Sequence, residues 1–220
     1  TLAGRNLAKV RAAADEFENA FAVVCDVSDE TSVNAAFAEA RDRYGVVDIL
    51  INNAGQAPSA PFKNTDLKLW NETLGINLTG AFLCTRAALP DMLDAKWGRI
   101  VNVGSVCSLK GYAYVSAYVA SKHGLLGLTR ALAHETAKKG VTVNCVCPGY
   151  VDTPIITESV DRITSKTALS AEDAHASLIQ FNPQGRIITP EEVASAIVYL
   201  CSDAAAAVNG AAVPITGGEI

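Results

Sequence analysis

The sequence lacks a surplus of basic residues and a long apolar run. Its 220 residues hold 18 Lys and Arg against 23 Asp and Glu, a formal net charge of −5. This balance argues against the basic surface that binds nucleic acid or anionic membranes. No apolar run approaches the roughly 20 residues of a membrane-spanning helix. We therefore expect no nucleic-acid or membrane partner, and a cytoplasmic protein.

Paired-cysteine motifs are also absent. None of the six cysteines belongs to a C-x-x-C pair, and Cys145 and Cys147 alternate within an apolar, strand-like run. Such cysteines are typical of free thiols that serve as small apolar core residues in a reducing compartment. No metal site is expected.

Apolar runs and helical patterns alternate along the chain. Half of the residues are apolar and 19% are charged, a composition typical of a globular protein. Alternation with short links predicts an α/β fold with a parallel sheet and helices on both faces. One domain over residues 1–220 is expected, with a substrate lid at about 150–188. The strands expected after the first three residues are 21–25, 46–51, 99–103, 141–147 and 211–215.

Several helix ends carry clear signals. Ser28 is the expected N-cap of a helix that ends at Gly45. A long helical stretch over 67–88 should break between residues 75 and 80. Another helix is expected over 116–139, and Thr189 begins the last one with a capping box.

A tyrosine and a lysine, Tyr118 and Lys122, lie one helical turn apart on the same face of the helix expected over 116–139. Ser105 precedes the tyrosine by thirteen residues, at the end of an apolar run. A phenol, an ammonium and a hydroxyl that converge beside a sheet edge indicate a proton-transfer site. The alternative is that the pair merely flanks a surface helix.

Small or polar residues follow every expected strand. In open α/β sheets, ligands bind at the carboxyl ends of the strands. A long flat cofactor crossing this edge would need such residues, although loops also use Gly and Asn for turns. The strand-end residues are Gly4-Arg5, Asp26-Val27, Asn53-Ala54-Gly55, Ser105 and Pro148-Gly149.

Together these motifs resemble the short-chain dehydrogenase/reductase family over nearly the whole chain. Residues 52–55 look like its N-N-A-G motif, and Asn77 falls at its helix asparagine. Ser105 with Tyr118 and Lys122 has its catalytic spacing, and residues 148–153 look like its P-G-x-x-x-T segment. The resemblance implies a Rossmann-like doubly wound sheet and an oxidoreductase that interconverts a ketone and a secondary alcohol.

The resemblance also implies roles for the catalytic candidates. Tyr118 would be the acid/base, and the Lys122 ammonium would lower its pKa and hold the nicotinamide ribose. Ser105 would orient the substrate oxygen. Asn77 would position a water in a proton relay, and it can also stabilise a helix kink.

Cofactor choice depends on Arg5. NAD-using relatives usually carry an acidic residue at the end of this strand. Arg5 could instead pair with a 2′-phosphate, so NADP(H) is favoured over NAD(H), unless Arg5 is only a solvated turn residue. Asp26 would hydrogen-bond the adenine, with Val27 beside it. The other cofactor candidates are Asn53, Ala54, Gly55, Tyr118, Lys122, Pro148, Gly149, Val151 and Thr153.

The substrate candidates are less specific. Cys107 and Val115 stand where hydroxybutyrate enzymes have polar groups, which favours a larger or less charged ketone such as a 3-oxoacyl thioester. The alternatives are an NAD-dependent 3-hydroxy acid dehydrogenase and a non-catalytic nucleotide-sensing or scaffold relative. Tyr112 and Tyr114 could form an aromatic wall or a subunit contact. The substrate candidates are Ser105, Gln56, Cys107, Tyr112 and Tyr150.

One family motif, the glycine-rich loop T-G-x-x-x-G-x-G, is absent. We therefore expect an N-terminally incomplete chain that lacks the central strand, with a gap between the strands that end at Gly4 and Asn53. By the resemblance we also expect a homo-oligomer, a dimer or tetramer. The helical stretches 67–88 and 116–139 would suit its interface, because they carry apolar residues on more than one face.

Overall fold

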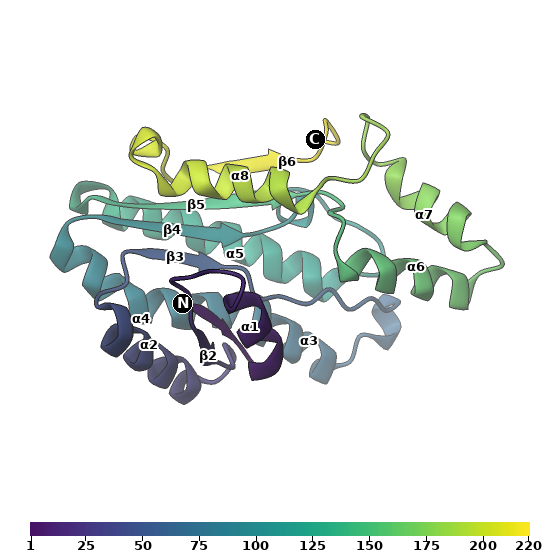
Figure 1. The fold of residues 1–220 in the computed structure, drawn as a ribbon. Coiled ribbons are helices and arrows are strands. Elements are labelled where there is room, and N and C mark those ends of the chain that lie inside the picture. Colours follow the sequence, from purple (N-terminus) through teal and green to yellow (C-terminus); the bar gives the residue numbers. More distant parts are fainter.

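Strands and helices alternate along the chain in a computed structural model (Figure 1). The structure describes the backbone of residues 1–220 and every side chain except those at 155, 158 and 166. The strands are β1 (Leu2–Gly4), β2 (Ala22–Val24), β3 (Ile49–Asn52), β4 (Gly98–Val103), β5 (Val141–Pro148) and β6 (Ala212–Ile215).

Most helices begin at a side-chain cap. Asp66 accepts a hydrogen bond from the Leu69 backbone N–H, and Thr189 and Glu192 form the expected capping box. The helices are α1 (Leu7–Ala14), α2 (Glu30–Tyr44), α3 (Leu67–Leu74), α4 (Gly80–Ala95), α5 (Ser116–Thr136), α6 (Pro154–Lys166), α7 (Ala171–Ile179) and α8 (Pro190–Cys201). Shorter helical segments are η1 (Phe62–Asn64), η2 (Gly75–Thr79), η3 (Val106–Ser108), η4 (Ala137–Lys139) and η5 (Asp203–Ala205).

A parallel sheet in the order β3-β4-β5-β6 forms the centre of the molecule. Helices cover both of its faces, so the doubly wound α/β prediction is confirmed. Ile100 and Val143 pack with α4 and α5, whereas Val101 and Val146 pack with α8 on the other face. Both central strands are therefore buried on two sides, which is why they read as continuous apolar runs.

The first two strands form a separate parallel pair. No ladder joins β1 to β3 among residues 1–220, which confirms the gap expected between the strands ending at Gly4 and Asn53. A cleft of about 560 Å³ lies there, bordered by β1, β2, β3, α2 and α4. Ile51 on β3 is consequently 46% exposed.

Two helix predictions need correction. Asp29, and not Ser28, is the N-cap of α2, because its carboxylate accepts from the Thr31 and Ser32 backbone N–H groups. Ser28 instead donates to Asp26. The stretch 67–88 breaks where expected, but η2 is a π-helical segment that joins α3 to α4, and α4 continues past the expected end at residue 88 to Ala95.

The six cysteines are free thiols, as predicted. Five are buried, and the Cys145 and Cys147 sulfurs lie 3.8 Å apart on one face of β5.

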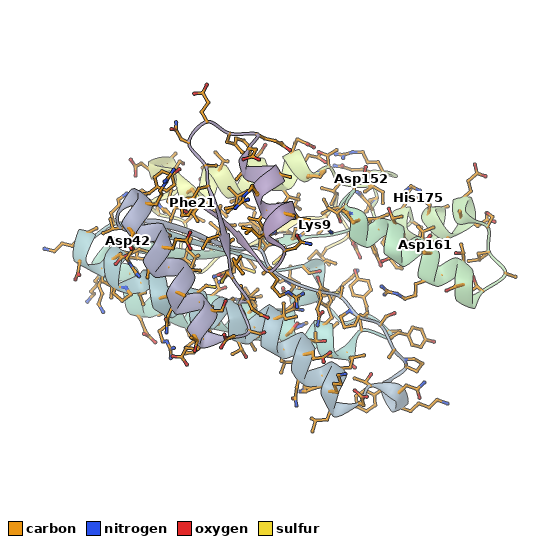
Figure 2. All side chains as sticks on the ribbon, turned by 60° about the horizontal axis from the view of Figure 1, so that its bottom comes forward. Lys9, Phe21, Asp42, Asp152, Asp161 and His175 are labelled. Carbon is orange, nitrogen blue, oxygen red and sulfur yellow. The ribbon has the colours of Figure 1, made fainter. Side chains whose placement is uncertain are left out.

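Residues 150–188 hold α6 and α7, which project from the body of the molecule (Figure 1). Figure 2 places Asp161 on α6 and His175 on α7 at one end, and Asp42 on α2 at the other. None of the helices in the described part of the chain combines the length and apolar character that a membrane span needs.

Candidate active site

Three predicted catalytic side chains come together where β4 ends. Ser105 is the N-cap of η3, and its hydroxyl accepts a hydrogen bond from the Cys107 backbone N–H at 3.1 Å. Tyr118 and Lys122 lie one turn apart near the start of α5. A hydrogen bond from Ser105 reaches the Tyr118 phenol. The spacing read from the sequence therefore corresponds to a real cluster.

Lys122 is nearly enclosed, with 4% of its surface exposed. Its Nζ donates to the Val103 carbonyl at 2.7 Å and lies 5.6 Å from the centre of the Tyr118 ring. Burial lowers the pKa of Lys122 to about 8. The ammonium form therefore prevails at neutral pH and is lost as the pH rises through about 8.

The pKa of Tyr118 differs from the sequence-based prediction. Burial raises it to about 12, and the hydrogen bond from Ser105 offsets only part of that rise. The predicted lowering by Lys122 is wrong for this arrangement, because the lysine hydrogen-bonds the Val103 carbonyl and not the phenol. Tyr118 is thus a protonated phenol at neutral pH, suited to giving a proton.

Asn77 lies in η2 and is 1% exposed. Its Nδ2 donates to the Gln56 carbonyl at 2.9 Å and to Ser121 Oγ at 3.0 Å, and its Oδ1 accepts from the Gln56 N–H at 2.9 Å. Ser121 in turn donates to the Tyr118 carbonyl at 2.7 Å. Asn77 therefore ties the loop after β3 to the tyrosine helix, and its π-helical setting matches the kink alternative.

The predicted cofactor residues lie at the carboxyl ends of the strands. Two hydrogen bonds from Ser28 lower the pKa of Asp26 after β2, and the charge of Arg5, which is exposed after β1, adds a smaller lowering. Val27 packs against Gly80, where a Cβ would lie 2.7 Å from a Val27 methyl. The remaining ones are the exposed Asn53, Ala54 and Gly55 after β3, the buried Pro148, and the half-buried Gly149, Val151 and Thr153.

The strand-end groups fit a nicotinamide ribose. The buried Lys122 ammonium donates to the Val103 carbonyl, and no second acceptor for it is found among the described residues. A Cβ at Gly55 would lie 3.6 Å from the Lys122 Nζ and 3.4 Å from Asn77 Oδ1. The bare backbone at Gly55 therefore leaves room beside a donor that ribose hydroxyls could satisfy.

The predicted substrate residues separate into two groups. Gln56 bonds to Asn77, and Cys107 is buried two residues after Ser105, where burial raises its pKa to about 11. Tyr112 and Tyr150 both contact Phe181, which follows α7. Tyr114 does not join them: it is 67% exposed with φ at +67°, and its carbonyl accepts from the Ala60 N–H.

Residues that the sequence reasoning missed also border this region. Tyr112 donates a hydrogen bond to Glu219, and Lys110 pairs with the same carboxylate at 2.9 Å. Glu219 follows the last strand, so the strand-end rule that selected the other candidates would also have found it. Nothing local in the sequence indicated Phe181.

Comparisons with known proteins agree with this geometry. The family model described as Enoyl-(Acyl carrier protein) reductase matches residues 1–219. The chain is 40% identical to a D-beta-hydroxybutyrate dehydrogenase of Cupriavidus necator, covering 89% of this chain and 76% of that protein. It is 35% identical to the 3-oxoacyl-(acyl-carrier-protein) reductase FabG of Aquifex aeolicus, covering 99% and 85%.

A solved structure of an actinorhodin polyketide ketoreductase variant with NADPH superposes with a TM-score of 0.92 and 35% identity, covering 99% of this chain and 85% of that one. The chain belongs to the short-chain dehydrogenase/reductase family. It is an oxidoreductase of the kind that interconverts alcohols and ketones, and members of this family bind NAD or NADP.

Proposed function

We propose that this chain interconverts a ketone and a secondary alcohol with Tyr118 as the proton-transfer group. The observation that carries the proposal is the convergence of Ser105, Tyr118 and Lys122 where β4 ends. We assign the catalytic roles to these three residues and a supporting role to Asn77. The completeness of this set argues against a non-catalytic nucleotide-sensing or scaffold relative.

The nicotinamide cofactor supplies or takes up the hydride when bound. Ser105 hydrogen-bonds the substrate oxygen and orients it for Tyr118. Because its pKa is raised to about 12, Tyr118 is protonated at neutral pH and can give its proton to an oxygen that gains negative charge. The Lys122 ammonium stabilises that charge, so the resting protonation states of both residues suit the proton-giving step of ketone reduction.

We propose NADP(H) as the preferred cofactor. Arg5 stands exposed after β1 in the stretch Ala3-Gly4-Arg5-Asn6, which holds no carboxylate of its own for a ribose 2′-hydroxyl, and a guanidinium suits a 2′-phosphate. The NADPH in the solved ketoreductase relative supports this choice. Asp26 and Val27 are assigned to the adenine side.

The proposed substrate is a 3-oxoacyl thioester or a related carbonyl, held partly by the lid over residues 150–188. The 3-oxoacyl reductase relative supports it. The hydroxybutyrate dehydrogenase relative favours a second candidate, an NAD-dependent 3-hydroxy acid dehydrogenase.

We also propose a homo-oligomer, dimer or tetramer, because Phe82 on α4 and Val198 on α8 are exposed apolar side chains.

Replacing the phenol tests the function directly. Tyr118→Phe should lower kcat by about 10²–10⁴-fold, because it removes the transferable proton while keeping the ring. Turnover is followed by nicotinamide absorbance with a ketone panel on the full-length protein, and cofactor affinity is measured in parallel. Tyr44→Phe, at the end of α2, is the matched control and should keep its activity. Full activity in Tyr118→Phe contradicts the assignment.

A further inference from the structure

A buried carboxylate, Glu219, lies beside the predicted substrate residues. Its side chain is 4% exposed, and Oε1 accepts from both the Lys110 ammonium, at 2.9 Å, and the Tyr112 hydroxyl. The Lys110 Nζ also lies 5.0 Å from the centre of the Tyr112 ring. One ammonium and one phenol thus hold a carboxylate that follows the last strand.

The turn before Glu219 fixes its position. Gly217 has φ at +63°, and a Cβ there would overlap the Asn182 side chain, so the chain must pass close to residue 182. Asn182 is itself tied down, because its Nδ2 donates to the Arg186 carbonyl at 2.8 Å and its Oδ1 accepts from the Gln184 N–H at 2.9 Å. The carboxylate is therefore placed by a close backbone contact with the segment that follows α7.

Three aromatic rings continue from the carboxylate toward the catalytic residues. Tyr112 meets Phe181 edge to face at 6.0 Å between ring centres, and Phe181 stacks on Tyr150 at 6.0 Å. Tyr150 directly follows Gly149. The charge of Glu219 reaches Cys107, whose backbone N–H bonds the Ser105 hydroxyl. Glu219 and the three rings thus form a connected row, here called the wall, and Tyr150 at its end lies close enough to Tyr118 to influence its pKa.

We propose that Glu219 is a specificity residue that selects ketones with an uncharged far end, such as an ester, thioester or amide, over ketones with a free carboxylate. This inference rests on the proposed function. The three rings offer an apolar surface to such a tail, and Glu219 holds Tyr112 in that wall through its hydrogen bond.

The charges of Glu219 and Lys110 at the wall support a preference for uncharged ketones. Lys110 is the described cation that pairs with Glu219, so a second carboxylate placed at the wall would lose hydration beside a buried anion whose cation is already engaged. Like charges placed close together are strongly unfavourable. Arg162 on α6, which donates to Ser59 in the loop after β3 at 3.0 Å, is the competing candidate for a carboxylate receptor.

Ethyl acetoacetate and acetoacetate test the inference, because they differ only at the far end. The full-length protein should give a kcat/KM about tenfold or more higher for the ester. Glu219→Gln should shrink that ratio by about tenfold, mainly through the KM of the acid, because it removes the anion and keeps the shape. Glu135→Gln, an exposed glutamate at the far end of α5, is the control for total charge and should keep the wild-type ratio.

Two results would overturn the inference. One is an unchanged ester-to-acid ratio in Glu219→Gln. The other is a wild-type preference for the acid that Arg162→Met removes, which would make Arg162 the carboxylate receptor. Calorimetric affinities of the protein–cofactor complex for both ligands give the same ratio without turnover. A failure of turnover with every ketone therefore contradicts the proposed function, whereas the affinity ratio still decides this inference.

Discussion

Strands β4 and β5 are enclosed on both faces, whereas β1, β2 and β3 border an open cleft. Ile100 on β4 and Val143 on β5 have no exposed surface. In contrast, Val24 on β2 is 50% exposed and Ile51 on β3 is 46% exposed. The enclosed strands lead to the proton-transfer residues, and the strands at the cleft lead to the residues assigned to the adenine and the 2′-phosphate.

This difference follows from the gap between β1 and β3, because no strand pairs with the open edge of β3 within residues 1–220. Proton transfer depends on short distances, and close packing holds side chains at such distances. Lys122 is placed in the enclosed region although burial penalises its charge. Arg5, which we assign to the 2′-phosphate, stands on an exposed turn, where a flexible cation can still meet a phosphate.

A matched pair of isoleucines measures the contrast in packing and carries the largest expected effect. Ile100→Ala should lower the free energy of unfolding by about 2–5 kcal/mol, because it opens a cavity in a closed core. Ile51→Ala, on the neighbouring strand, should cost no more than about 1 kcal/mol in the chain of residues 1–220, because its side chain is half exposed there. Denaturant unfolding measures both. Equal losses would contradict the contrast.

Removing the buried ammonium should stabilise the enclosed region. The pKa of Lys122 falls from 10.5 to about 8, which corresponds to a penalty of about 3 kcal/mol at neutral pH. Loss of the bond to the Val103 carbonyl offsets about 1 kcal/mol, so Lys122→Met should gain about 2 kcal/mol while activity falls. Denaturant unfolding at neutral pH measures the gain.

The pH dependence checks the origin of that gain. Because the folded pKa lies below the unfolded one, the penalty is complete below about pH 8 and disappears as the pH rises to about 10.5. The stability difference between Lys122→Met and wild type should therefore shrink across this window. The exposed Lys138→Met serves as the control. A difference that stays constant with pH would show that packing, and not charge, explains the gain.

The smallest expected effect concerns Arg5, on the exposed turn after β1. Arg5→Ala should reduce the kcat/KM preference for NADPH over NADH by about tenfold, roughly 1.4 kcal/mol, through loss of the phosphate contact. The change should appear mainly in the KM for NADPH. Lys9→Ala, an exposed cation on α1, is the matched control. An unchanged cofactor ratio in Arg5→Ala would assign Arg5 to the solvated turn instead.

Much of the fold followed from local patterns. Strand–helix alternation predicted the parallel sheet, and the break near Asn77 fell at a π-helical segment. Boundaries were less accurate where two capping residues competed, as Ser28 and Asp29 did. The proximity of Ser105, Tyr118 and Lys122 was predictable because Tyr118 and Lys122 share one helix face and parallel strands end at one edge of the sheet.

The sequence by itself determined which residues occur at the strand ends and how the tyrosine and lysine are spaced, because both depend on short-range geometry. Only the tertiary structure decided the direction of the Tyr118 pKa, since desolvation depends on everything packed around the phenol. It also brought Glu219 to Tyr112 across 107 positions of the chain. Contacts between segments so far apart leave no periodic signal in the sequence, and they arise only when the sheet and the segment after α7 are packed together.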